Sequence, residues 1–147
     1  MKIYIASSWK NAAKVRETAQ LLRDAGHEVY DFTDGEKHYS FNLSEIADPK
    51  TITQFDLMRM PQSWKAFAAD KAGIDWADVV LLLLPAGNSA HAEMAYAIGK
   101  GKMAIITGDF KPGDYDVMRL FADVITPDMN EAIEYLNHWD KVFKKER

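Results

Sequence analysis

The sequence predicts a single α/β domain of 147 residues, built on a doubly wound sheet of five parallel strands. Short apolar runs alternate with amphipathic segments, as they do when each strand is followed by a helix that crosses to the next parallel strand. The run from Val79 to Leu84 contains no polar residue, which is typical of a strand covered on both faces. Turn residues, from Pro85 to Ser89, follow this central strand directly.

The N-terminal part of the chain predicts a β-α-β unit. Residues 2–6 read as a short buried strand, and residues 11–25 as a helix with Val15, Ala19 and Leu22 on one face. Gly26 suits the position just after a helix, and residues 27–32 read as the second strand. Two parallel strands require such a crossover.

Residues 33–60 show weak periodicity and contain turn signals at Asp34-Gly35, Asp48-Pro49 and Met60-Pro61. A segment of this length without regular structure is usually functional or mobile. We therefore expect a loop or lid inserted at about residues 33–60, with one helical turn near 55–59. The spacing of Trp64 and Phe67 predicts a helix over about 62–73, with both rings in the core or, as the alternative, one of them stacked on a ligand.

The C-terminal half continues the alternation. Ser89 is expected to cap a helix, and residues 102–107 predict a fourth strand. A short helix over 117–121, a fifth strand over 123–126 and an amphipathic helix over 128–144 complete the pattern. The pattern thus predicts that the whole chain, 1–147, forms one flavodoxin-like or Rossmann-like domain, although the sequence leaves the order of strands open.

Composition narrows the classes of function. The formal net charge is -4, from 18 basic and 22 acidic residues, and gives no basic surface for a nucleic acid polymer. The absence of cysteine excludes disulfides and thiolate metal sites. No apolar run approaches the roughly 20 residues of a membrane helix, and no signal peptide precedes the first strand. We expect a cytoplasmic protein that binds neither membrane nor metal.

Three side chains are expected at the carboxyl edge of the sheet, where open α/β proteins bind ligands. Tyr4 lies in the first strand, Asp70 in the helix before the central strand, and Glu93 in the helix after it. Adjacent first and central strands, common in such sheets, would bring Tyr4 close to Glu93. Each residue also has an ordinary explanation: Tyr4 as core, Asp70 as a solvated charge, and Glu93 as an acid favoured by the helix dipole.

The ordered motifs resemble those of the nucleoside 2-deoxyribosyltransferases and the related deoxynucleotide N-glycosidases. The similarity spans residues 2 to about 125 and rests on four motifs. The first two are Ile3-Tyr4-Ile5 and the segment from Asp70 to Asp78, which contains Ile74 and Ala77. The other two are Glu93-Met-Ala-Tyr-Ala97 and Gly101-Lys102. Each motif is loose, but the ordered set is fairly specific.

The resemblance implies retaining glycosyl chemistry without a cofactor. Glu93 would attack the anomeric carbon of a (deoxy)nucleoside or its monophosphate and form a glycosyl-enzyme ester. Tyr4 would orient that carboxylate, and Asp70 would contact the sugar or manage the proton on the leaving base. Such roles require an ionised Glu93 and a proton donor of raised pKa, which different environments could provide.

The substrate-binding residues implied by the resemblance lie in two loops. They are Ser7, Ser8, Trp9, Gly87, Asn88, Ser89 and His91. Serines and the helix that begins near Ser89 could hold a phosphate. The loop before Glu93 lacks the acid that many transferases of this family carry, so the sequence leaves transferase and hydrolase open.

Other classes of function remain as alternatives. A non-catalytic nucleotide-binding or sensor module could use the same fold, since fold does not fix function. A NAD-cleaving domain of the Toll/interleukin-receptor type also uses a glutamate, but fits the Tyr, Asp and Glu pattern less well. A response-regulator receiver would need acids after the first strand, and a dinucleotide-binding domain would need a Gly-x-Gly-x-x-Gly motif there. The resemblance and an apolar stripe on the terminal helix (Ile133, Leu136, Trp139 and Val142) predict a homo-oligomer.

Overall fold

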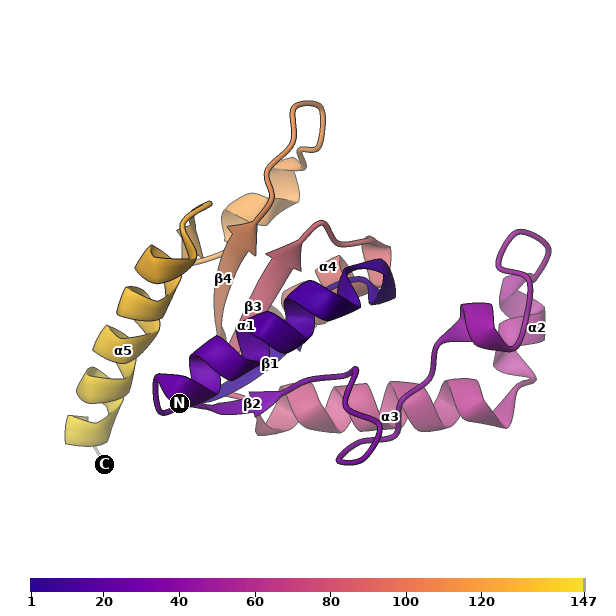
Figure 1. Cartoon of the computed structure of the whole chain (residues 1–147), viewed down its shortest axis with the longest axis horizontal. Coiled ribbons are helices and arrows are strands. Elements are labelled where there is room, and N and C mark those ends of the chain that lie inside the picture. Colours follow the sequence, from indigo (N-terminus) through magenta and orange to yellow (C-terminus); the bar gives the residue numbers. More distant parts are fainter. Residues whose placement is uncertain (147) are drawn as a thin grey trace.

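A computed structural model describes residues 1–146 and confirms the predicted fold. A single parallel sheet has the strand order β2-β1-β3-β4-β5, the flavodoxin-like order. The strands are β1 (Lys2–Ala6), β2 (Glu28–Tyr30), β3 (Val79–Leu84), β4 (Met103–Gly108) and β5 (Val124–Ile125). In Figure 1 helices lie on both faces of this sheet, so the architecture has three layers.

Alternate residues of the central strands enter two separate cores, as the two-residue period of a strand requires. Val79, Leu81 and Leu83 pack on one face against α1 (Ala12–Asp24) and α5 (Met129–Glu146). Val80, Leu82 and Leu84 pack on the other face with Ile74 of α3 (Pro61–Trp76) and with Met94 of α4 (Asn88–Gly99). All six residues of β3 are buried, which explains why its sequence is uninterrupted by polar residues.

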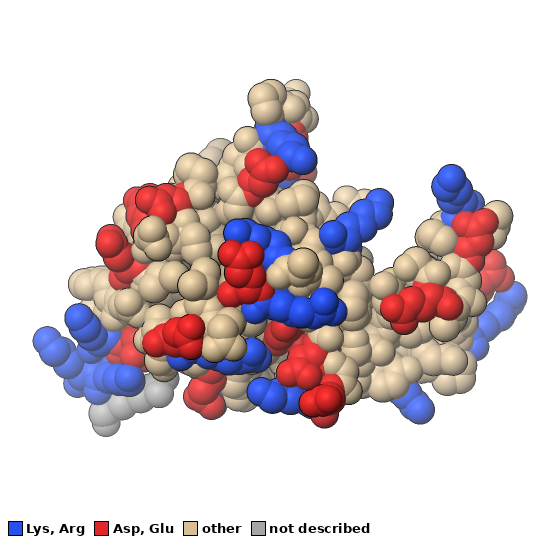
Figure 2. Space-filling model, in the orientation of Figure 1, with Lys and Arg blue, Asp and Glu red and all other residues tan. Residues whose placement is uncertain are grey.

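The segment over 33–60 contains little regular structure, namely the 3₁₀ turn η2 (Leu43–Glu45) and the short helix α2 (Gln54–Met58). The helical turn expected near residues 55–59 is therefore confirmed. Thr53 and Asp56 form a capping box that begins α2. In Figure 1 α2 and the first turns of α3 project beyond the sheet as an arm, and Figure 2 shows a hollow between this arm and the body of the molecule.

Two details of the predicted helices were wrong. α4 begins one residue after Gly87, which occupies the cap position in an extended conformation, so Ser89 lies inside the first turn and does not cap the helix. Trp64 and Phe67 are 57% and 61% exposed, because the first half of α3 projects past the sheet and the short helix α2, which packs there, leaves both rings largely uncovered. Helical spacing alone cannot distinguish a buried stripe from an unpartnered one.

The apolar stripe of the terminal helix is used within the molecule. Leu136 is fully buried, and Ile133 and Trp139 pack against the same core. Most of the stripe therefore packs against the sheet within the molecule, while Val142 remains 39% exposed. No helix among residues 1–146 is long and apolar enough to cross a membrane.

Candidate active site

The candidate site lies where the sheet reverses its winding, at the carboxyl ends of β1 and β3. Tyr4 pairs in register with Val80 of β3, and its ring is almost completely buried. The short turn after β3 leads into α4, whose second turn carries Glu93. The Tyr4 hydroxyl donates a hydrogen bond to Glu93 Oε2, so the proximity expected for these two residues is confirmed.

Asp70 joins the pair from α3. Its carboxylate shares one cavity with Glu93, and its Oδ1 accepts a hydrogen bond from the Tyr30 hydroxyl at 3.4 Å. Three predicted catalytic residues, separated by up to 89 positions in the sequence, thus meet at one edge of the sheet. Tyr30, which no sequence motif singles out, is also part of this cluster.

Burial changes the acidity of all four groups. It is the main cause that raises the pKa of Glu93 to about 7, helped by the charge of Asp70 and opposed by the Tyr4 hydrogen bond. Burial also raises the pKa of Asp70 to about 6, and the Tyr30 and Tyr4 hydroxyls oppose it. Both tyrosines have pKa values raised above their ordinary value, chiefly by burial, and remain donors.

The two carboxyl pKa values differ from the sequence expectation. An ionised Glu93 beside a single group of raised pKa was expected, whereas the pKa values of both acids are raised. The physical reason is that both acids face the same poorly hydrated cavity, so ionising one disfavours ionising the other. The pair therefore titrates as a unit around neutral pH.

A cavity of about 540 Å³ opens in front of the two acids. Besides Asp70 and Glu93 it is lined mainly by apolar side chains, including Leu57, Phe67 and Ile74. A mostly apolar cavity with a few converging polar groups is the usual form of a small-molecule site. Phe67 was not among the predicted substrate-binding residues, because its spacing favoured core packing over stacking on a ligand.

A second cavity, of about 590 Å³, contains six of the seven predicted substrate-binding residues, Ser7, Ser8, Trp9, Gly87, Asn88 and Ser89. Ser89 lines both cavities, so the two are adjacent. The Ser7 hydroxyl donates to the Leu83 carbonyl at 2.7 Å, while Ser8 caps the 3₁₀ turn η1 (Trp9–Asn11). Phe41, Asn42 and Leu43 of the inserted segment form the opposite wall.

The structure places His91 away from both cavities. Its Nδ1 lies 2.7 Å from the Gly87 carbonyl, and its Nε2 accepts from Arg119 Nε at 3.1 Å. Arg119, on the 3₁₀ turn η3 (Val117–Phe121), is buried and also pairs with Asp114 at 2.8 Å. These contacts tie the loop before α4 to η3, so His91 supports the loop that lines the cavity.

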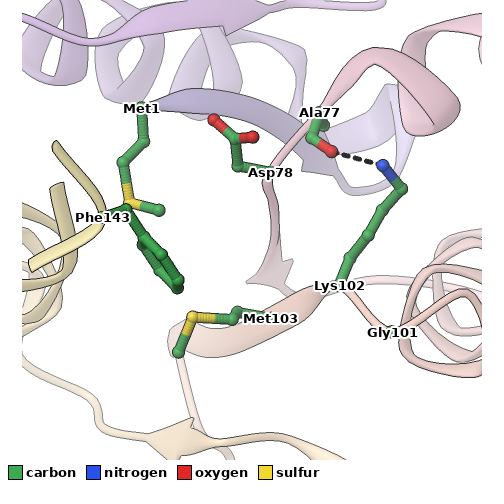
Figure 3. A pocket seen from close by; sticks show the side chains of 7 residues that line it. All are labelled: Met1, Ala77, Asp78, Gly101, Lys102, Met103 and Phe143. Carbon is green, nitrogen blue, oxygen red and sulfur yellow. Dashed lines mark hydrogen bonds between the residues drawn. The ribbon is translucent and has the colours of Figure 1, made fainter. Parts of the chain in front are cut away.

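A smaller cavity of about 230 Å³ lies at the amino ends of the strands (Figure 3). Met1, Met103 and Phe143 face it, and the Lys102 ammonium turns toward the Ala77 carbonyl. Asp78 accepts a hydrogen bond from the Lys2 amide at 2.9 Å. Near this end of the sheet the N-terminal ammonium lies 3.1 Å from His27 Nδ1 and donates to Asp140 at 3.0 Å. Among residues 1–146, no group of three or more His, Asp or Glu side chains could hold a metal ion.

Comparison with solved structures shows that enzymes acting on nucleosides or nucleotides share this fold. A 2-deoxyribosyltransferase from Bacillus psychrosaccharolyticus superposes with a TM-score of 0.64 at 18% identity, covering 90% of each chain. The CMP N-glycosidase BcmB of Clostridium botulinum superposes with a TM-score of 0.54 at 16% identity, covering 95% of this chain and 99% of its own. No family model and no curated protein sequence matches this chain.

Proposed function

We propose that this protein cleaves or exchanges the N-glycosidic bond of a (deoxy)nucleoside or (deoxy)nucleoside monophosphate through a covalent intermediate on Glu93. The observation that carries the proposal is the Tyr4–Glu93 hydrogen bond beside Asp70, in a cavity at the carboxyl edge of the sheet. The shared fold of a 2-deoxyribosyltransferase and a CMP N-glycosidase supports the same class of substrate.

The proposed reaction has two steps. A carboxylate oxygen of Glu93 attacks the anomeric carbon as the bond to the base nitrogen breaks, and Asp70 gives its proton to the departing base. Water or a second base then attacks the same carbon, its proton goes to Asp70, and Glu93 is released as a carboxylate. The Tyr4 hydroxyl holds Glu93 in one orientation, and the charge of Glu93 stabilises the oxocarbenium-like transition state.

In this proposal each of the two cavities binds a different part of the substrate. The sugar and base occupy the cavity that contains Asp70 and Glu93, with Phe67 available to stack on the base. A 5′-phosphate, where present, lies in the adjacent cavity, near Ser7, Ser8 and the first turn of α4. The positive end of this helix and its unpaired backbone N–H groups favour an anion there.

The titration of the acid pair predicts a bell-shaped dependence of kcat/KM on pH. The active form is the singly protonated pair with the proton on Asp70 and the charge on Glu93. Activity should fall below about pH 6, where both carboxyls hold protons, and above about pH 7, where neither does. Asp70→Asn should lower activity and abolish the alkaline limb, since an amide donates no proton to the base. A profile that is flat from pH 5 to pH 8 would contradict the assigned roles.

The direct test of the function is turnover. The protein is incubated with a panel of nucleosides, deoxynucleosides and their monophosphates, with and without a free acceptor base, and base release is followed by chromatography. Release that depends on acceptor indicates a transferase, and release in water alone indicates a hydrolase. Tight binding without turnover, unaffected by Glu93→Ala, would instead support the non-catalytic binding module.

We also propose a homo-oligomer and place its contact at η3, because most of the α5 stripe is used within the molecule. Five apolar side chains between residues 115 and 121 are more than half exposed, namely Tyr115, Val117, Met118, Leu120 and Phe121. Large apolar patches of this kind mark interaction surfaces. Leu120→Lys should lower the mass measured by analytical ultracentrifugation, whereas Leu21→Lys, on the exposed side of α1, should leave it unchanged. A wild-type protein that sediments as a monomer at all concentrations would refute the proposal.

A further inference from the structure

We propose that Tyr30 is a positioning residue that holds both candidate carboxylates in place, one through its hydroxyl and the other through its ring. The inference rests on the proposed function for its catalytic consequence, but on the geometry alone for the contacts. The Tyr30 hydroxyl donates to Asp70 Oδ1 at 3.4 Å. Its ring stacks on the ring of Tyr4, with centroids 4.9 Å apart and planes 19° apart, and Tyr4 in turn donates to Glu93.

The position of the Tyr30 ring is fixed by the backbone of α3. A Cβ atom added at Gly73 would lie 2.7 Å from ring atoms of Tyr30, well inside van der Waals contact. Gly73 is one helical turn beyond Asp70, so the ring packs on the same helix that carries the acid it binds. Only glycine at position 73 allows the ring to approach closely enough for its hydroxyl to reach Asp70.

His38 closes the remaining face of the ring. Its imidazole stacks on Tyr30 with centroids 3.8 Å apart and planes 25° apart. Burial lowers the pKa of His38, which keeps the ring neutral and suited to stacking. Tyr30 and His38 both line a cavity of about 510 Å³ on this side, together with Lys37, Tyr39 and Trp76, so the stacked imidazole covers part of the ring and leaves an edge at the cavity.

The charged groups around this stack come from four elements. Asp70 of α3 and Glu93 of α4 act on Tyr30 from the site. Asp31, Asp34 and Lys37 of the loop after β2, and Arg23 of α1, act on His38 from the outer side. Among these groups only Asp70 shares a hydrogen bond with Tyr30. Loss of the Tyr30 hydroxyl should therefore change the pKa of Asp70 more than that of any other of these groups.

The test compares Tyr30→Phe with Tyr96→Phe by NMR titration of the Asp70 carboxyl carbon in the free protein. Tyr30→Phe keeps the stacked ring and removes the hydroxyl that favours the ionised acid. The Asp70 midpoint should rise by about one pH unit above its wild-type value, the size of one hydrogen bond to a charged group. Tyr96 lines the same cavity but donates to Asp75 at 2.7 Å, so its variant should leave the Asp70 midpoint unchanged.

An unchanged Asp70 midpoint in Tyr30→Phe, or equal changes in both variants, would overturn the inference. Because the titration needs no substrate, it reports on Tyr30 even if the protein proves inactive in the turnover panel. Where turnover is found, the alkaline limb of the pH profile of Tyr30→Phe should move in the same direction as the Asp70 midpoint. Tyr30→Leu, which also removes the ring, should in addition lower kcat, because Tyr4 loses its support.

Discussion

Glu93→Gln is expected to abolish base release while stabilising the folded protein at alkaline pH. An amide forms no glycosyl ester, so turnover should fall by about 10⁴-fold or more, as when a covalent nucleophile is removed. The hydrogen bond from the Tyr4 hydroxyl can still be accepted by the amide oxygen, so the geometry of the site should persist. Loss of activity and gain of stability in one variant would separate the chemical role of Glu93 from a structural one.

The gain in stability follows from linkage. The pKa of Glu93 is raised from 4.5 to about 7 on folding, so the folded state binds the proton more tightly than the unfolded state. Stability therefore falls as pH rises from about 4.5 to 7, and the ionised acid costs about 3 kcal/mol above that range. Glu93→Gln removes this cost at pH 8 but not at pH 4.

Denaturant unfolding at the two pH values measures this difference. The matched control is Glu17→Gln, an exposed glutamate on α1, which should change the free energy of unfolding little at either pH. Equal stability of wild type and Glu93→Gln at pH 8 would show that the carboxyl is ionised in the folded state without penalty.

Gly108→Ala is expected to destabilise the protein by about 4 kcal/mol, through overpacking combined with backbone strain. Gly108 has a φ of 114°, and an added Cβ would lie 2.4 Å from the Leu84 carbonyl oxygen and 2.8 Å from the Leu84 nitrogen. Both contacts are with backbone at the end of β3, which cannot move without disturbing the turn into α4. The variant should also bind substrate poorly, since this turn lines the cavity.

Gly26→Ala provides the control. Gly26 also has a positive φ, of 93°, but nothing lies within 4 Å of its added Cβ. Its substitution should therefore cost only the conformational penalty, about 1 kcal/mol. If thermal or denaturant unfolding gave the same loss for both variants, close packing of β4 on β3 would not be the reason for glycine at position 108.

The sequence predicted those features that depend on local pattern. Val79 to Leu84 is apolar because both faces of β3 are covered, and Gly26 ends α1 with a positive φ, as its position suggested. The proximity of Tyr4 and Glu93 was also predictable, because a parallel sheet brings the carboxyl ends of its strands to one edge.

The features that depend on tertiary contacts could not be predicted. The tyrosine at position 30 is an ordinary strand residue in the sequence, and its role appears only when β2, β1 and α3 are placed side by side. His91 and Arg119 are 28 positions apart, and no local pattern pairs them. The raised pKa values of Asp70 and Glu93 depend on the burial of both acids, which sequence spacing does not define.

The central claim is a covalent bond between Glu93 and the sugar. We would incubate the protein with a nucleoside carrying fluorine at C2 of the sugar, because the electron-withdrawing substituent slows breakdown of the ester, and measure the intact protein by mass spectrometry. The account predicts an increase equal to the sugar without its base, located by digestion to the peptide containing Glu93 and absent in Glu93→Gln. Base release from this substrate with no adduct on the protein, or an adduct that persists in Glu93→Gln, would contradict it.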